Sequence, residues 1–178
     1  MGWRIDAENA AVLLVDVQEK LLPVIADADQ IKRRQLLLLQ GAKALGLPIY
    51  VTEQYPKGLG NTVSDLIKGI EPEKIFEKTS FSAAPAVSDL DARHWIVAGI
   101  ESHICVRQTV YDLQAAGRTA VIMADACGSR NSLDHQIAMQ ELQADRILVG
   151  SVESFLFEIL GDADHKEFKT ISNLVKDA

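Results

Sequence analysis

Short, wholly apolar runs alternate with longer stretches of helical periodicity along most of this chain, and this alternation restricts its fold more than any other feature. The clearest run is AAVLLV at residues 10–15, which is typical of a parallel strand covered by helices on both faces. The alternation predicts an α/β fold with a parallel sheet between helical layers and right-handed crossovers. Ligands of such sheets bind at the carboxyl ends of the strands.

The predicted elements follow the same order along the chain. Strands are expected near residues 10–16, 48–52, 73–77, 94–99, 119–124 and 146–149. Helices are expected near residues 28–45, 104–116 and 131–144, with a short helix before the third strand and two helices after the last. Residues 54–62 are expected to form a loop inside the domain.

Composition excludes several classes of function. A net charge of -7 would repel nucleic-acid phosphates and anionic lipid, so we expect no nucleic-acid partner. No apolar run approaches the length of a membrane span and no signal peptide is recognisable, so no membrane partner is expected. Two cysteines are too few for a secreted disulfide framework, which favours a cytoplasmic location.

Three reactive side chains lie at the ends of predicted strands or just beyond them. Asp16 follows the first strand, Lys78 follows the third, and Cys105 opens the helix after the fourth. Because a buried carboxylate needs a partner, Lys78 is expected to pair with Asp16. A helix N-terminus is expected to lower the pKa of Cys105. Cys127, in the loop after the fifth strand, has no such neighbours and is interpreted as structural.

Other common motifs are absent from the sequence. The GLG at residues 58–60 lacks the third glycine of a dinucleotide-binding fingerprint, because Val63 stands in its place. The four histidines have no spacing typical of a zinc site: His94, His103, His135 and His165.

Four segments together resemble the isochorismatase-like cysteine hydrolase superfamily. They are DVQEK at residues 16–20, TEQYPKGLG at residues 52–60, EKTSFS at residues 77–82 and GIESHICVRQT at residues 99–109. The second and fourth of these segments most resemble the isochorismatase-domain-containing subgroup, whose substrates are unassigned. This resemblance implies a single isochorismatase-like hydrolase domain over residues 1–178, a three-layer Rossmann-like fold with a six-stranded parallel sheet, and a homo-oligomer.

The resemblance also implies a catalytic site. It places a catalytic triad on Asp16, Lys78 and Cys105, and a cis peptide bond before Glu101. The backbone N–H groups of Glu101 and Cys105 would then form an oxyanion hole. Candidates for substrate contact near the crevice are Gln18, Tyr55, Phe81, Glu101 and His103. The Glu101 side chain is expected either in the pocket or at a subunit interface.

Two departures from known relatives narrow the expected chemistry. Nicotinamidases carry metal ligands after the second strand, where this chain has Glu53, Gln54 and Tyr55, so we expect no metal and no cofactor. Isochorismatases proper do not rely on a cysteine at the position of Cys105. The expected reaction is therefore hydrolysis of a C–N bond in a small amide- or imide-like substrate through a thioester. A catalytically silent scaffold and a thiol redox sensor are the alternatives.

Overall fold

Six parallel strands form the centre of the computed structural model, which describes residues 4–5 and 7–178. In spatial order they are β3 (Lys74–Lys78), β2 (Ile49–Gln54), β1 (Ala10–Val15), β4 (His94–Ile100), β5 (Thr119–Gly128) and β6 (Leu148–Gly150). All neighbouring pairs are parallel, which confirms the expected six-stranded parallel sheet. The strand order reverses between β1 and β4, and ligands of open parallel sheets bind outside the carboxyl ends of the strands at such a switch point.

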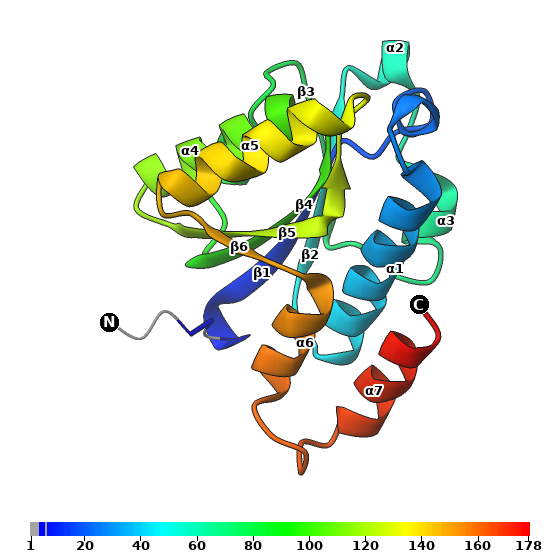
Figure 1. Cartoon of the computed structure of the whole chain (residues 1–178), viewed down its shortest axis with the longest axis vertical. Coiled ribbons are helices and arrows are strands. Elements are labelled where there is room, and N and C mark those ends of the chain that lie inside the picture. Colours follow the sequence, from blue (N-terminus) through cyan, green and yellow to red (C-terminus); the bar gives the residue numbers. More distant parts are fainter. Residues whose placement is uncertain (1–3, 6) are drawn as a thin grey trace.

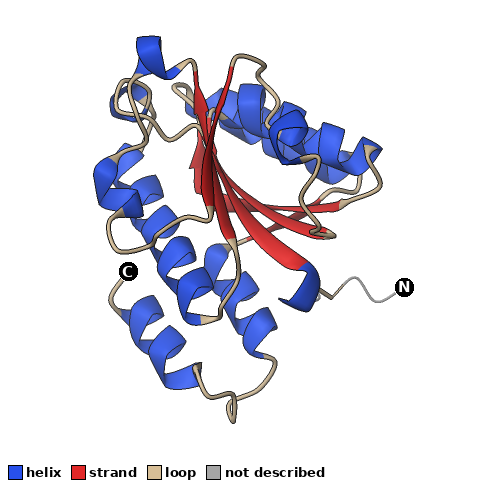
Figure 2. Cartoon of the chain, turned by 180° about the vertical axis from the view of Figure 1, so that it is seen from behind, coloured by secondary structure: helices blue, strands red, loops and turns tan. Residues whose placement is uncertain are grey.

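Helices cover both faces of the sheet (Figure 1). One layer consists of α1 (Ala28–Ala44), α3 (Ser64–Ile67), α6 (Val152–Leu160) and α7 (Phe168–Lys176). The other contains α4 (Arg107–Ala115) and α5 (Ser132–Ala144). The view from behind shows the sheet edge-on between these layers (Figure 2). Shorter elements complete the chain: η1 (Ala7–Asn9), η2 (Leu22–Val24), α2 (Pro56–Leu59), η3 (Ala84–Val87) and the π-helical turn η4 (Ser102–Val106). None of the described helices combines the length and apolarity needed to cross a membrane.

The two central strands form the most deeply buried part of the core. Every residue of β1 and β4 is buried, as their continuous apolar sequences predicted. Gly99 allows the close approach of these strands, because a Cβ atom there would overlap the carbonyl oxygen of Val15. Its φ of +135° is also a conformation that other residues rarely adopt.

Three local predictions differ from the structure. Strand β5 continues to Gly128, so Cys127 lies inside a strand rather than in the loop expected after it. The reason is tertiary pairing, since Cys127 and Gly128 extend the ladder opposite Gly99 and Ile100 of β4. The expected loop at residues 54–62 contains α2, and the helix expected from residue 104 begins earlier, as the π-helical turn η4.

Candidate active site

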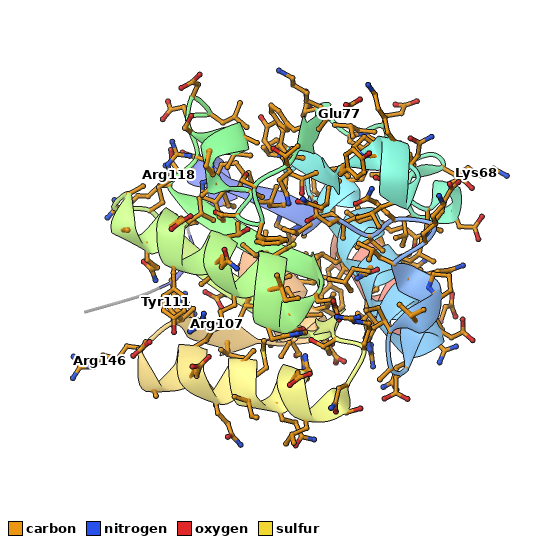
Figure 3. The ribbon with its side chains drawn as sticks, turned by 90° about the horizontal axis from the view of Figure 1, so that it is seen from above. Lys68, Glu77, Arg107, Tyr111, Arg118 and Arg146 are labelled. Carbon is orange, nitrogen blue, oxygen red and sulfur yellow. The ribbon has the colours of Figure 1, made fainter. Side chains whose placement is uncertain are left out.

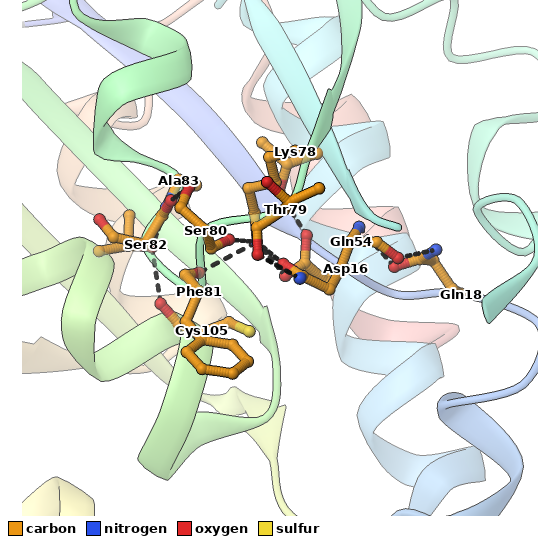
Figure 4. Close-up of polar contacts among 12 residues, drawn as sticks. Asp16, Gln18, Gln54, Lys78, Thr79, Ser80, Phe81, Ser82, Ala83 and Cys105 are labelled. Atoms are coloured by element: carbon orange, nitrogen blue, oxygen red, sulfur yellow. Dashed lines mark hydrogen bonds and ion pairs between the residues drawn. The ribbon is translucent and has the colours of Figure 1, made fainter. Parts of the chain in front are cut away.

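Asp16 lies directly after β1 in a left-handed backbone conformation, with a φ of 54°. Its side chain is completely buried, and both carboxylate oxygens have partners. Oδ2 accepts a hydrogen bond from Lys78 Nζ at 2.6 Å, and Oδ1 accepts one from Thr52 Oγ1 at 2.7 Å. The predicted pairing of Asp16 with Lys78 is therefore present, as a buried ion pair (Figure 4).

Lys78 is the last residue of β3, and its side chain is only 4% exposed. Besides Asp16, its ammonium group donates to Gln54 Oε1 at 2.8 Å and to the carbonyl oxygens of Ser80 and Phe81 at 3.0 Å each. An ammonium group has three hydrogens, so these four acceptors share them. The cation is thus fixed against the carboxylate and at the same time orders the chain that follows β3.

Cys105 lies in the turn η4, where the residue is only 6% exposed. Burial, and next the negative charge of Asp16, raise the pKa of its thiol to about 12, although Lys78 opposes the shift. The charges of Asp16 and Lys78 therefore both act on the pKa of this thiol. The lowered pKa predicted from the helix N-terminus is wrong, because desolvation and the adjacent carboxylate outweigh the helix dipole.

The turn that carries Cys105 begins at a cis peptide bond between Ile100 and Glu101, as the resemblance implied. The carbonyl oxygen of Glu101 accepts hydrogen bonds from the N–H groups of Ile104 at 3.1 Å and Val106 at 3.2 Å. Glu101 and Cys105 therefore belong to one closed turn. Thr109 fixes the end of this turn, because its hydroxyl donates a hydrogen bond to the Cys105 carbonyl oxygen at 2.6 Å.

Among the expected substrate contacts, Gln18 is completely buried and already fully hydrogen-bonded. Its amide nitrogen donates to the carbonyl oxygens of Gln54 at 3.0 Å and Gly60 at 2.6 Å, and its Oε1 accepts from Gln54 N–H at 2.8 Å. Gln18 thus holds the loop that follows β2. Tyr55 and Phe81 are each 55% exposed and available for contact. A cavity of about 460 Å³ beside Lys78 is lined by Tyr55, Pro56, Lys57, Glu77, Lys78 and Thr79.

Glu101 and His103 both contact the connection between β5 and α5. The Glu101 carboxylate is bound by Arg130 of the same chain, and His103 Nδ1 lies 2.9 Å from Ser129 Oγ. Nothing in the local sequence marks Arg130 or Ser129 as part of the site. Thr52 likewise has the sequence context of an ordinary strand residue, although it is completely buried beside Asp16.

The positions that bind metal in nicotinamidases have other roles here. Glu53 Oε1 accepts hydrogen bonds from the N–H of Thr62 at 2.6 Å and from its hydroxyl at 2.7 Å. Gln54 binds Lys78, and Tyr55 projects toward solvent. Within the described residues, no group of three or more histidine, cysteine, aspartate or glutamate side chains could hold a metal ion.

Comparison with known proteins gives a consistent family match. The model of the isochorismatase domain matches residues 10–154. Isochorismatase domain-containing protein 1 of Salmo salar is 39% identical over 168 residues, which cover 90% of this chain and 59% of that protein. The chain therefore spans about three fifths of this relative's length. Isochorismatase domain-containing protein 2A of Mus musculus is 36% identical over 180 residues, covering 98% of this chain and 86% of that protein.

A solved structure agrees with these sequence relatives. The structure described as MAR1 ribonuclease from Caenorhabditis elegans superimposes with a TM-score of 0.92 at 35% sequence identity. The match covers 97% of this chain and 92% of the other. Both the order of the elements and nearly the whole length of the chain are therefore shared with that protein.

Proposed function

This chain belongs to the isochorismatase family, and from that premise we propose that it is a cysteine-dependent hydrolase of a C–N bond in a small amide- or imide-like substrate. One observation carries the proposal: Asp16 and Lys78 form a buried ion pair whose two charges both act on the pKa of the Cys105 thiol. A buried pair of charges next to a nucleophile is costly to retain in a protein that only needs a stable core. The proposal requires neither a metal nor a cofactor.

The raised pKa of Cys105 determines how the attack begins. With a pKa of about 12, the fraction of thiolate at neutral pH is on the order of one in 100,000. Thiolate that is already present before substrate binds therefore contributes little to the reaction. Instead, the Sγ proton passes to Asp16 while the Sγ–carbon bond to the substrate carbonyl forms, so Asp16 acts as general base. The Lys78 ammonium balances the carboxylate and keeps it oriented.

Each later step has an assigned group. The carbonyl oxygen becomes an oxyanion held by the backbone N–H groups of Glu101 and Cys105, and losing one such donor typically costs about 100- to 1,000-fold in rate. The C–N bond then breaks, and the leaving nitrogen takes the proton from Asp16. Water next gives a proton to Asp16 and attacks the thioester. When the Sγ–carbon bond breaks, the sulfur recovers that proton.

The alternative functions fit the site less well. A redox sensor requires an accessible thiol of low pKa, whereas Cys105 is 6% exposed and its pKa is raised. For a silent scaffold, the apolar segment FLFEIL at residues 155–160 would offer area suited either to a partner or to the core. However, Phe155, Leu156 and Leu160 of this segment are buried in the core. The net charge of -7 favours a small-molecule substrate over RNA.

Ammonia release from a library of small amides and imides tests the proposal. The wild-type protein is expected to release ammonia from at least one compound, Cys105→Ser to lose this activity, and Cys127→Ser to keep it. Chelator is expected to have no effect, and an RNA oligonucleotide incubated in parallel is expected to stay intact. Undiminished turnover by Cys105→Ser, or RNA cleavage in place of ammonia release, would contradict the proposal. The proposed homo-oligomer is tested by light scattering of the same samples.

A further inference from the structure

Three consecutive side chains tie the turn that carries Cys105 to the connection between β5 and α5 and to the first turns of α5. Glu101 Oε2 accepts hydrogen bonds from both the backbone N–H of Arg130 at 2.9 Å and its Nε at 3.1 Å. The hydroxyl of Ser102 lies 2.9 Å from His135 Nδ1. His103 pairs with Ser129, described above. Strands β4 and β5 remain paired to their last residues, so the two connections leave the sheet next to each other.

Glu101 adds a second carboxylate at the start of the turn that carries Cys105. Its side chain is 8% exposed, so water screens its carboxylate poorly. Burial and the charge of Asp16 are the main causes that raise the pKa of Cys105, and the charge of Glu101 adds to that rise. A carboxylate in this position would oppose the oxyanion that the same turn is proposed to stabilise. Unless its negative charge is neutralised, the Glu101 carboxylate would destabilise the oxyanion.

Arg130 is placed to neutralise it. Its Nε meets the Glu101 oxygen, while the rest of its side chain extends into solvent and is 62% exposed. The contacts made by Ser102 and His103 prevent the turn from moving away from this partner. We propose that Arg130 is a positioning residue that holds and masks the Glu101 carboxylate, so that the adjacent backbone N–H groups can stabilise an oxyanion. This inference rests on the proposed function and adds to it the role of a residue outside the triad.

The test separates oxyanion formation from thiolate formation. Acetylation of Cys105 by p-nitrophenyl acetate forms the Sγ–acyl bond through an oxyanion, passes the thiol proton to Asp16 and expels p-nitrophenolate. Alkylation of the same thiol by iodoacetamide expels iodide and places no new charge on a carbonyl oxygen. Both reactions need the thiol proton removed, so the ratio of their rates at Cys105 reports the oxyanion contribution. Peptide mass spectrometry assigns each adduct to Cys105.

Arg130→Gln is expected to lower this ratio by about tenfold or more, since it leaves the Glu101 carboxylate unmasked. The double variant Glu101→Gln/Arg130→Gln is expected to recover most of the loss, because the opposing charge is gone. Arg107→Gln is the matched control. It removes the side chain of Arg107 on α4 (Figure 3), whose Nε lies 2.7 Å from Glu141 Oε2 in a surface ion pair with α5. The backbone N–H of Arg107, which donates to the carbonyl oxygens of Ser102 and Ile104 in the turn, is retained. Its ratio is expected to stay within about twofold of wild type.

Three results would overturn the inference. The first is an unchanged ratio in Arg130→Gln, and the second is a wild-type ratio no higher than that of N-acetylcysteine. The third is an equal loss in the single and double variants, which would mean that Arg130 acts through its own charge rather than through Glu101. If Arg130→Gln fails to fold, Glu101→Gln alone still tests the idea, because unmasking requires a charge and this variant must then keep or raise the ratio. Failure of the proposed function is recognised separately, as absence of ammonia release.

Discussion

Replacing Lys78 with methionine should destabilise the protein far more than the loss of a typical ion pair. Its Nζ lies 2.6 Å from Asp16 Oδ2, and the two side chains are 4% and 0% exposed. Without the ammonium, the carboxylate keeps only the hydrogen bond from Thr52. Removing one partner of a buried pair costs about 3–5 kcal/mol, because the other charge stays buried without compensation. For a chain of this size, that corresponds to a fall in Tm of roughly 6–20 °C.

A surface pair of similar geometry provides the control. Lys32 Nζ and Asp65 Oδ2 lie 3.0 Å apart, but their side chains are 29% and 65% exposed. Lys32→Met is therefore expected to cost at most about 1 kcal/mol. The double variant Asp16→Asn/Lys78→Met should recover much of the loss, since asparagine tolerates the positive φ and carries no charge. Urea denaturation of the variants measures these free energies of unfolding. Losses for Lys78→Met and Lys32→Met that agree within about 1 kcal/mol would refute the reasoning.

Three further predictions concern the thiols and the close approach of β1 and β4. The rate at which iodoacetamide alkylates Cys105 should rise about tenfold per pH unit between pH 7 and 10, because its pKa is about 12; a plateau below pH 9 would contradict this. Burial raises the pKa of Cys127 from 9.0 to about 12, so the unfolded state loses this proton first as the pH rises. Between pH 9.0 and about 12, this thiol should therefore lower the free energy of unfolding by about 1.4 kcal/mol per pH unit. Cys127→Ala should flatten the slope of Tm against pH; parallel curves for the two proteins would exclude this contribution of Cys127. Gly99→Ala should cost roughly 3 kcal/mol or more in chemical denaturation, since a Cβ there overlaps Val15, and a loss below about 1 kcal/mol would count against the described approach of β1 and β4.

The positions of the central strands were predictable because buried parallel strands have largely apolar sequences. The run AAVLLV predicted such a strand, and β1 begins and ends with it. The end of β5 was not predictable in the same way. Asp125 interrupts its apolar pattern, and the strand continues only because Cys127 and Gly128 pair with β4. Such an extension depends on the neighbouring strand rather than on the local sequence.

The pairing of Asp16 with Lys78 was also predictable, since residues at the carboxyl ends of parallel strands share one edge of the sheet. The electrostatic state of Cys105 was not. A helix N-terminus suggested a lowered pKa, but the depth of burial and the distance to Asp16 are tertiary properties. The role of Gln18 was hidden for the same reason, because only the folded chain reveals that its amide is already bonded to the loop after β2.

The central claim is that the Cys105 sulfur becomes covalently acylated during turnover. A compound found by ammonia release can be mixed with the protein, quenched in acid within milliseconds to seconds, and analysed by peptide mass spectrometry. We predict that the peptide containing Cys105 gains the mass of the compound less ammonia, and that Cys105→Ser shows neither the adduct nor turnover. Steady turnover with no adduct on the Cys105 peptide, retained in Cys105→Ser, would contradict the account.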